Sequence, residues 1–230
     1  QVEDQLLIND LFPDKKTVIL EIGSGMGEAT AGIAEHFPDT GFVAVEMHNP
    51  GLGALLLLIL EKKLENIKLI REDATHLLNN FIPDNSIDLV FTDPPYFDQV
   101  AYSEYLVIWE FFTGLATDLE NEIIQSNRES FASDRDNYLK LMQDGFKIIS
   151  DKLKENHLAI IYFKDSKLTN VFDFLRVLQN VQLEYLTQVH VSKPKFTYKQ
   201  NTSQKSTVEG DSLYVFRKNS SLSEVLPTNE

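Results

Sequence analysis

The segment Asp93-Pro94-Pro95-Tyr96 carries the groups of this sequence that are best suited to chemistry. It follows an apolar run, residues 87–92, that predicts a buried strand. The two prolines fix their φ angles and lack N–H groups, so they predict a stiff loop that offers carbonyl oxygens. These carbonyls and the Asp93 carboxylate can accept hydrogen bonds from an amino group, while Tyr96 offers a ring face for stacking. The segment therefore predicts a site for the amino group of a flat heteroaromatic base.

Such a site suits group transfer to the amino nitrogen itself. That nitrogen is a poor nucleophile because its lone pair is conjugated with the ring, and hydrogen bonds to Asp93 and a proline carbonyl would localise the lone pair. Catalysis would then rest on positioning and electrostatics. The chain has no cysteine, which excludes thiolate attack on a ring carbon, disulfides and thiolate metal sites. The histidines show no metal-ligand spacing, and a base would have to be single-stranded or flipped out of a duplex to enter.

A second set of candidate residues lies nearer the N-terminus. The run Glu21-Ile22-Gly23-Ser24-Gly25-Met26-Gly27 follows a predicted strand, and its glycines allow a tight turn that can approach a ligand closely. Glu46 and Asp73 end the next two predicted strands, where carboxylates can accept hydrogen bonds from ribose hydroxyls and an adenine amino group. Because ligands bind at the carboxyl ends of parallel strands, the three features are expected to share one crevice. A nicotinamide site is the competing interpretation, but it predicts no Asp-Pro-Pro-Tyr segment after the fourth strand.

The glycine run resembles the first motif of the class I S-adenosylmethionine-dependent methyltransferases. This resemblance implies S-adenosyl-L-methionine as the cofactor, bound by the loop of Gly23, Gly25 and Gly27. It also implies that Glu21 lies near the methionine end or orders the loop. Glu46 would bind the ribose and Asp73 the adenine.

Residues 12–90 resemble the bacterial tRNA (guanine-N7) methyltransferases. The resemblance is carried by residues 20–27, by the Glu-x-His-x-Pro-Gly stretch within residues 45–53, and by residues 82–86. That family continues into Pro-Asp-Pro-Trp and a dense basic run, whereas this chain continues into Asp93-Pro94-Pro95-Tyr96. The guanine-site residues of the family therefore do not carry over.

Residues 91–218 are similar to the adenine-specific DNA methylases of the Asp-Pro-Pro-Tyr type. The similarity is carried by residues 92–103 with Trp109, by residues 197–201 and by residues 209–211. Because this half contains the reacting loop, it implies methylation of adenine N6 in DNA, with cytosine N4 having the same local geometry. Methylation of guanine N7 in tRNA is the alternative, and a non-catalytic subunit that binds cofactor or nucleic acid is a third hypothesis.

Contacts to the substrate are expected from two regions. Tyr102 and Ser103 lie closest to the reacting loop, and Lys195 and Lys199 belong to a basic stretch within residues 189–218. This stretch is either a solvated loop or a patch that faces a phosphate backbone. The net charge of −14 opposes binding to nucleic acid, and no target-recognition domain is evident. Target recognition is therefore expected from a partner protein or a homodimer.

The remaining pattern alternates β-branched runs with amphipathic helices, which predicts an α/β fold. Strands are expected at residues 17–22, 42–46, 67–71, 87–92 and 158–163, followed by an antiparallel pair at 183–191 and 212–217. Helices are expected at residues 28–36, 51–64, 74–81, 102–112, 134–154 and 168–178. Together they predict a doubly wound, mostly parallel, Rossmann-like sheet of seven strands. The sheet would form a single domain over residues 1–218, followed by a disordered tail at 219–230.

The apolar runs are too short for a membrane span. The longest covers residues 52–60 and is followed at once by Glu61, Lys62 and Lys63. No leader pattern precedes the first predicted strand. The expectation is a cytoplasmic protein.

Overall fold

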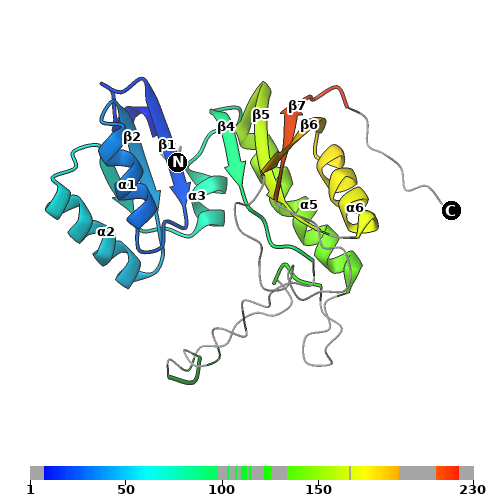
Figure 1. The fold of residues 1–230 in the computed structure, drawn as a ribbon, viewed down its shortest axis with the longest axis horizontal. Helices are drawn as coiled ribbons and strands as arrows, with labels where there is room; N and C mark the ends of the chain where they lie inside the picture. Colours follow the sequence, from blue (N-terminus) through cyan, green and yellow to red (C-terminus); the bar gives the residue numbers. More distant parts are fainter. Residues whose placement is uncertain are drawn as a thin grey trace. The chain divides into compact units, whose positions relative to one another are not determined.

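The computed structural model describes most of the chain as two compact units, residues 1–84 and 85–230 (Figure 1). The described residues are 8–97, 134–165, 167–191 and 211–222, with 103, 107, 110–112, 114 and 122–125 between them. The single domain expected over residues 1–218 stays a prediction. Within the described ranges, no helix combines the length and apolarity that a membrane span needs.

The first unit is built on a three-stranded parallel sheet. Its elements are a short 3-10 helix (Ile8–Leu11), β1 (Thr17–Ile22), α1 (Glu28–His36), β2 (Thr40–Val45), α2 (Asn49–Lys62), β3 (Ile67–Ile70) and α3 (Ala74–Asn80). The strand order is β1-β2-β3. Ile22 pairs with Val45, and Val45 pairs with Ile70. The three strands therefore end level with one another, as ligand binding at this edge requires.

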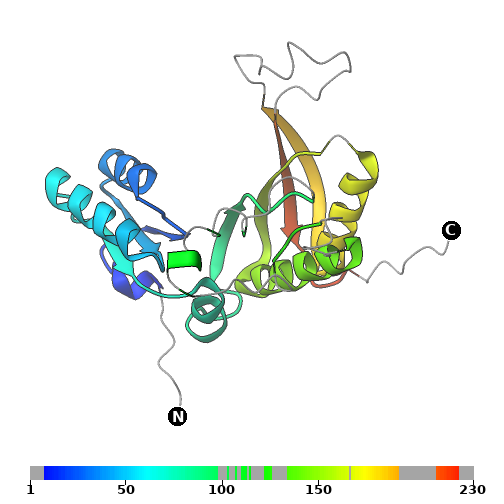
Figure 2. The same ribbon diagram turned by 90° about the horizontal axis from the view of Figure 1, so that it is seen from below.

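The core of the first unit lies between this sheet and helices α1 and α2, which lie side by side in Figures 1 and 2. Strand β2 is buried almost throughout, as expected for the central strand of a parallel sheet. Its residues Phe42 and Ala44 belong to one buried cluster with residues of both helices and of β3, namely Ala31, Ala34, Leu55 and Ile67.

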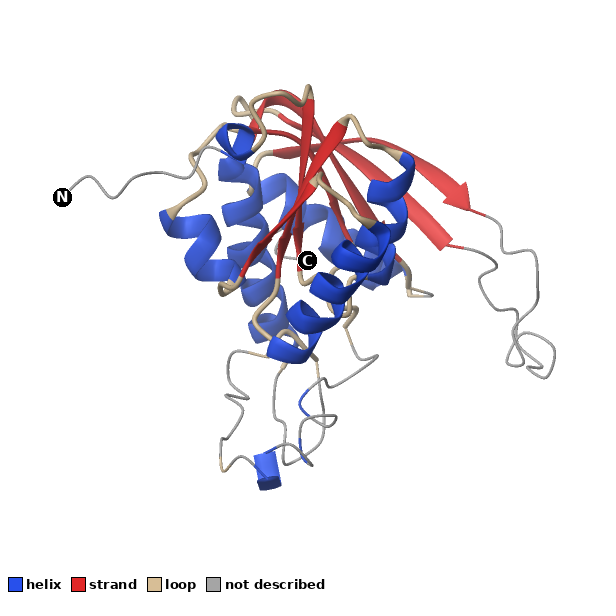
Figure 3. Cartoon of the chain, turned by 90° about the vertical axis from the view of Figure 1, so that its left-hand side faces the viewer, coloured by secondary structure: helices blue, strands red, loops and turns tan. Residues whose placement is uncertain are grey.

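The second unit is built on a four-stranded mixed sheet. Its elements are β4 (Ile87–Thr92), α5 (Arg135–Lys152), β5 (Leu153–Phe163), α6 (Leu168–Asn180), β6 (Leu183–Val191) and β7 (Asp211–Lys218). The strand order is β4-β5-β7-β6, in which β4 and β5 are parallel. Strand β7 runs antiparallel to β5 and β6, which confirms the predicted antiparallel pair. Figure 3 shows the strands of each unit in red and the helices in blue.

An aromatic cluster forms the core of the second unit. The rings of Phe163 on β5 and Phe174 on α6 stack with centroids 4.0 Å apart and an interplanar angle of 3°. Tyr214 and Phe216 of β7 pack against Phe174 with ring centroids 5.8 and 6.2 Å away. Because β5 and β7 are the inner strands, this cluster fixes α6 over the centre of the sheet.

The structure corrects the prediction of a single seven-stranded sheet. The described strands form a three-stranded parallel sheet and a four-stranded mixed sheet. The periodicity of apolar residues identifies a strand and its buried face, but it carries no information on which strand edges pair through hydrogen bonds. The expected α/β class is confirmed, and the single sheet is wrong.

Smaller differences concern the ends of elements. Strand β5 starts at Leu153, before the expected turn, and its register against β4 shifts between Leu153 and Leu158, where Asn156 adopts a left-handed φ of 62°. Helix α2 starts at Asn49 with Pro50 in its first turn, a position that suits proline. The expected tail starts with bonded residues, since the Asn219 N–H donates to the Gln182 carbonyl over 2.9 Å. Most of the helix expected at 102–112 and all of residues 223–230 lie outside the described residues.

Asn66 joins three parts of the first unit. Its side chain is buried, and Nδ2 lies 3.0, 3.1 and 3.0 Å from the carbonyl oxygens of Ala34, Phe37 and Thr40. These carbonyls end α1 and begin β2, while Asn66 itself precedes β3. The buried amide therefore donates to three carbonyls that lie in buried or half-buried places.

We expect Asn66→Asp to lower the free energy of unfolding by about 2–4 kcal/mol at pH 7, because a carboxylate would face carbonyl oxygens in a buried place. Urea unfolding measures the loss. Asn80→Asp is the matched control, since Asn80 Nδ2 also donates to a carbonyl, that of His76, but is exposed. The control should cost less than about 1 kcal/mol, and equal losses for the two variants would contradict the role of Asn66.

Candidate functional site

The glycine loop starts where β1 ends and is bonded to the end of β2. The N–H groups of Gly23 and Ser24 donate to the Val45 carbonyl over 2.8 and 3.3 Å. Gly23, Gly25 and Gly27 adopt φ angles of 79°, 56° and 76°, in the left-handed region that favours glycine. The predicted loop is thus present at the carboxyl edge of the parallel sheet.

The outer side of this loop is open to an approaching ligand. A Cβ atom built on Gly23 or Gly25 would meet no other atom within 4 Å, so the backbone there is accessible. Among the described residues, the Ser24 hydroxyl oxygen is buried without a hydrogen-bond partner. An accessible backbone and an unpaired hydroxyl in the same loop fit a polar ligand.

Glu46 holds the glycine loop to the start of α2. One carboxylate oxygen accepts from the Gly25 N–H and the other from the His48 N–H, both over 2.9 Å. Burial raises the pKa of Glu46, but the backbone N–H groups of His48, Gly25 and Met47 outweigh it, so the net pKa is below its ordinary value. Each oxygen can accept a further hydrogen bond, which leaves capacity for ribose hydroxyls.

Gly51 is a residue of this site that the sequence reasoning did not single out. A Cβ atom at Gly51 would stand 2.4 Å from the carbonyl oxygen of Gly25 and 3.3 Å from the Glu46 side chain. The first turn of α2 therefore packs directly on the glycine loop. The signal was the stretch His48-Asn49-Pro50-Gly51, in which proline starts the helix and glycine permits the close approach.

Glu21 and Asp73, the other two acids expected at the cofactor, also bond within the first unit. Glu21 on β1 accepts a hydrogen bond from the hydroxyl of Thr30, a buried residue of α1. Asp73 caps α3, and its Oδ1 accepts from the His76 N–H over 2.9 Å. Glu21 therefore ties the strand before the glycine loop to the helix after it, while Asp73 follows β3 and orders the next helix.

The Asp-Pro-Pro-Tyr loop belongs to the second unit and follows β4. Asp93 is exposed and accepts a hydrogen bond from the Tyr96 hydroxyl. The Tyr96 ring lies over the end of β5, with its centroid 6.4 Å from that of Tyr162 and 5.5 Å from that of Phe163. The Pro95 carbonyl accepts from the Tyr138 hydroxyl over 2.8 Å. Asp93 is therefore exposed to solvent, while Pro95 and Tyr96 are held by contacts with the rest of the second unit.

The expected substrate contacts have different places in the structure. Ser103 is buried, and both its N–H and its hydroxyl donate to the Glu122 carboxylate, over 3.0 and 2.6 Å. Nothing in the sequence pattern signalled Glu122, which lies 19 residues further along the chain. Tyr102, Lys195 and Lys199 lie outside the described residues. Within the described ranges, no group of three or more potential ligands is arranged to hold a metal ion.

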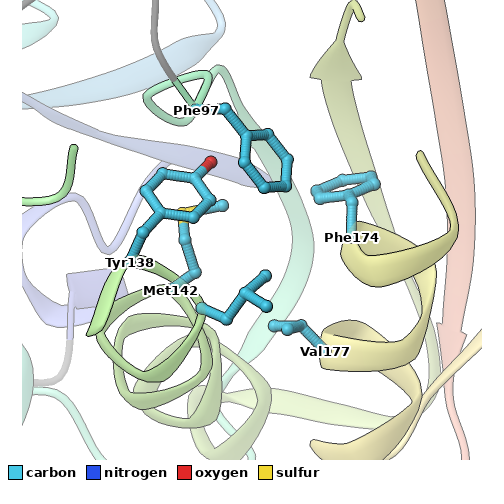
Figure 4. Close-up of a pocket in the computed structure, with 6 residues that line it drawn as sticks. Phe97, Tyr138, Met142, Phe174 and Val177 are labelled. Carbon is cyan, nitrogen blue, oxygen red and sulfur yellow. The ribbon is translucent and has the colours of Figure 1, made fainter. Parts of the chain in front are cut away.

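A small recess lies beneath Phe97, the residue that follows Tyr96 (Figure 4). It is lined by Phe97, Tyr138, Leu139, Met142, Phe174 and Val177. The one polar group of this lining, the Tyr138 hydroxyl, is bonded to the loop. The recess is therefore part of the core that supports the loop rather than a place for a polar substrate.

Two family models match the chain. The one described as a putative methyltransferase matches residues 15–147, and the one described as a DNA methylase matches residues 87–226. Both matches include the Asp-Pro-Pro-Tyr loop, and each covers more than half of the chain.

Relatives with assigned activities match a shorter part. The tRNA (guanine-N(7)-)-methyltransferase of Hydrogenovibrio crunogenus is 45% identical over 97 residues, which are 40% of this chain and 40% of that protein. The enzyme of the same name from Neisseria meningitidis serogroup C is 48% identical over 86 residues, 36% of each chain. The chain thus spans about two fifths of the length of these relatives. Among solved structures, a putative methyltransferase from Thermoplasma acidophilum has a TM-score of 0.48 at 14% identity, over 90% of this chain and 70% of that one.

The contact between α2 and the glycine loop yields a paired prediction. We expect Gly51→Ala to lower the free energy of unfolding by about 2 kcal/mol and to weaken S-adenosylmethionine binding about tenfold or more, because its Cβ would collide with backbone. Gly53→Ala in the same helix meets no atom within 4 Å and should stabilise by about 0.5–1 kcal/mol. Urea unfolding and calorimetric titration measure both effects, and similar behaviour of the two variants would rule out the close approach.

Glu46→Gln should weaken the glycine loop in a pH-dependent way. Because the folded-state pKa of Glu46 is lowered, its ionised form contributes stability above the unfolded-state pKa of about 4.3, and this is lost as the pH falls through the lower folded-state value. The variant should therefore be less stable than the wild type by about 1 kcal/mol at pH 7, a value discounted for solvent screening, and the gap should close in acid. Thermal melts from pH 3 to pH 7 test this, and a gap that persists unchanged at pH 3 would contradict it.

Proposed function

Because the chain belongs to the class I S-adenosylmethionine-dependent methyltransferases, we propose that it methylates a base of a nucleic acid, with guanine N7 of tRNA as the first target. The observation that carries the choice of target is the 45–48% identity to tRNA (guanine-N7) enzymes. The sequence pattern favoured DNA, and these relatives shift the preference to tRNA. The match to the DNA methylase family keeps an amino nitrogen, such as adenine N6 in DNA, as the second candidate.

The first unit fits the cofactor of this family. The left-handed glycines expose backbone at the edge of the sheet, and the Ser24 hydroxyl is buried there without a protein partner among the described residues. Glu46 keeps lone pairs for ribose hydroxyls, and Asp73 keeps one oxygen that does not cap α3. S-adenosylmethionine, when bound, supplies an electrophilic methyl group on a sulfonium. The residues of the first unit bind and orient it.

The Asp93 loop supports either target by hydrogen bonding. Guanine carries two adjacent donors, N1–H and the N2 amino group, and one carboxylate can accept from both. Guanine N7 already has a lone pair in the ring plane, so Asp93 would only need to orient the base. An amino nitrogen needs acceptors on the reacting atom itself, and Asp93 with the Pro94 carbonyl could provide them. Among the described residues, no protein donor bonds the Pro94 carbonyl, whereas Pro95 is bonded to Tyr138.

Identifying the methylated nucleoside tests the proposal. The wild-type protein is incubated with labelled S-adenosylmethionine and with separate tRNA and DNA pools, and the products are digested and analysed. N7-methylguanosine in tRNA supports the first candidate, and N6-methyladenine in DNA replaces it with the second. Binding of cofactor without transfer to either pool would leave a non-catalytic binding subunit and overturn the proposal.

Asp93→Ala should reduce transfer by at least about 100-fold on whichever pool is modified, because a charged acceptor at the base is lost. Cofactor affinity should stay within about twofold of the wild type, since the cofactor residues lie in the first unit. Asp88→Ala is the control, because Asp88 is an exposed acid on β4, the strand before the loop, and pairs with Lys154 over 2.7 Å. Retained turnover in Asp93→Ala would remove Asp93 from the mechanism.

A further inference from the structure

Tyr138, in the first turn of α5, contacts the reacting loop through both its ring and its hydroxyl. Its side chain is only 1% exposed. The hydroxyl donates to the Pro95 carbonyl over 2.8 Å, and the ring lies 4.4 Å, centroid to centroid, from that of Phe97. Figure 4 shows the two rings side by side, with the hydroxyl oxygen of Tyr138 in red.

The hydroxyl is not needed to fill the core. A phenylalanine would occupy the same volume without a polar atom, whereas a buried hydroxyl costs free energy unless it is bonded. It donates to a carbonyl of the Asp-Pro-Pro-Tyr loop, so its effect falls on that loop. Burial raises the pKa of Tyr138, and the negative charge of Asp165 raises it further, so the hydroxyl remains a donor at neutral pH.

A polar network on α5 and α6 holds the neighbouring part of the loop. The guanidinium of Arg135 lies 4.8 Å from the centroid of the Phe97 ring. Its Nε donates to Asp173 over 2.9 Å and its Nη1 to the buried Asn170 over 2.8 Å. Asn170 in turn donates to Asp165 over 2.7 Å. These contacts therefore fix the position of Phe97 and of the end of the loop.

Anchoring one proline carbonyl limits the orientation of the other. In two consecutive prolines both φ angles are fixed by the rings, so the ψ angles are the soft torsions left to the segment. A hydrogen bond to Pro95 and the buried ring of Phe97 restrain these torsions from one side. The Pro94 carbonyl and the Asp93 carboxylate precede this anchor, on the part of the loop that would meet a base.

We propose that Tyr138 is a positioning residue for methyl transfer, which holds the Pro95 carbonyl and thereby aims Asp93 and the Pro94 carbonyl at the substrate base. The inference rests on the proposed function. It assigns Tyr138 no contact with the substrate, so its loss should change the rate of transfer and leave binding of the cofactor unaltered.

The kinetic test compares Tyr138→Phe with Tyr214→Phe. Tyr214 is a matched control because it lies in the same aromatic core, is 7% exposed and, among the described residues, makes no hydrogen bond to the loop. We expect Tyr138→Phe to lower kcat about 10- to 100-fold, with KM and Kd for S-adenosylmethionine within twofold of the wild type. Tyr214→Phe should keep kcat within twofold. Circular dichroism and thermal melts establish that both variants are folded.

A spectroscopic measurement detects the hydrogen bond between Tyr138 and the Pro95 carbonyl without relying on activity. The full chain is labelled with ¹³C at the carbonyls of its eight prolines, and Pro95 is assigned by its loss in Pro95→Ala. The Pro95 carbonyl resonance should shift in Tyr138→Phe and stay in place in Tyr214→Phe. An unshifted resonance, or a shifted one with unchanged kcat, overturns the positioning role alone. A wild-type protein that methylates neither nucleic-acid pool overturns the proposed function and the positioning role with it, even where the resonance shifts.

Discussion

The candidate cofactor loop depends on the two hydrogen bonds that backbone N–H groups donate to the Glu46 carboxylate. The sheet places Glu46 first, because its own N–H donates to the Ile70 carbonyl at the end of β3 over 3.1 Å. The carboxylate then joins Gly25 to His48, and so joins the glycine loop to the start of α2. Gly51 completes the arrangement by letting the helix approach the Gly25 carbonyl. The Glu46 carboxylate thus fixes the glycine loop, which contains no strand or helix, relative to the ends of the parallel strands.

The Asp-Pro-Pro-Tyr loop of the second unit is held by different interactions. Its stiffness comes from two prolines, and its anchorage comes from a buried phenol and a buried phenyl ring, those of Tyr138 and Phe97. The Tyr138 hydroxyl is neutral at ordinary pH, whereas Glu46 acts as an anion. The cofactor loop is therefore held through an ionised carboxylate, whereas the Asp-Pro-Pro-Tyr loop is held through a neutral hydroxyl and through Phe97, whose ring lies beside Arg135.

Local features could be predicted from the sequence where a residue type strongly favours one backbone conformation, as glycine, proline and the β-branched residues do. Strands β1 and β4 match their predicted bounds because apolar β-branched runs end there at glycine or proline. The left-handed glycines and the Asp-Pro-Pro-Tyr loop were found for the same reason. The expected sheet of seven strands was wrong because pairing between strand edges leaves no periodic trace. Tyr138, Thr30 and Glu122 were missed because each acts on a residue 9 to 43 positions away, a relation that spacing along the chain does not reveal.

The choice between guanine N7 and an amino nitrogen can be stated as a question about the Pro94 carbonyl. For guanine, the donors that Asp93 would accept lie on the edge of the base opposite N7, so one carboxylate can orient the ring while the reacting atom needs no acceptor. For an amino nitrogen, two acceptors must converge on the reacting atom, and the Pro94 carbonyl is the second of them. The sequences of the relatives favour the first case, whereas the hydrogen bond that holds the Pro95 carbonyl, next to that of Pro94, favours a geometry that the second case would use. In the proposed function, Asp93 can accept hydrogen bonds from either base, so the choice of base would depend on contacts other than Asp93 alone.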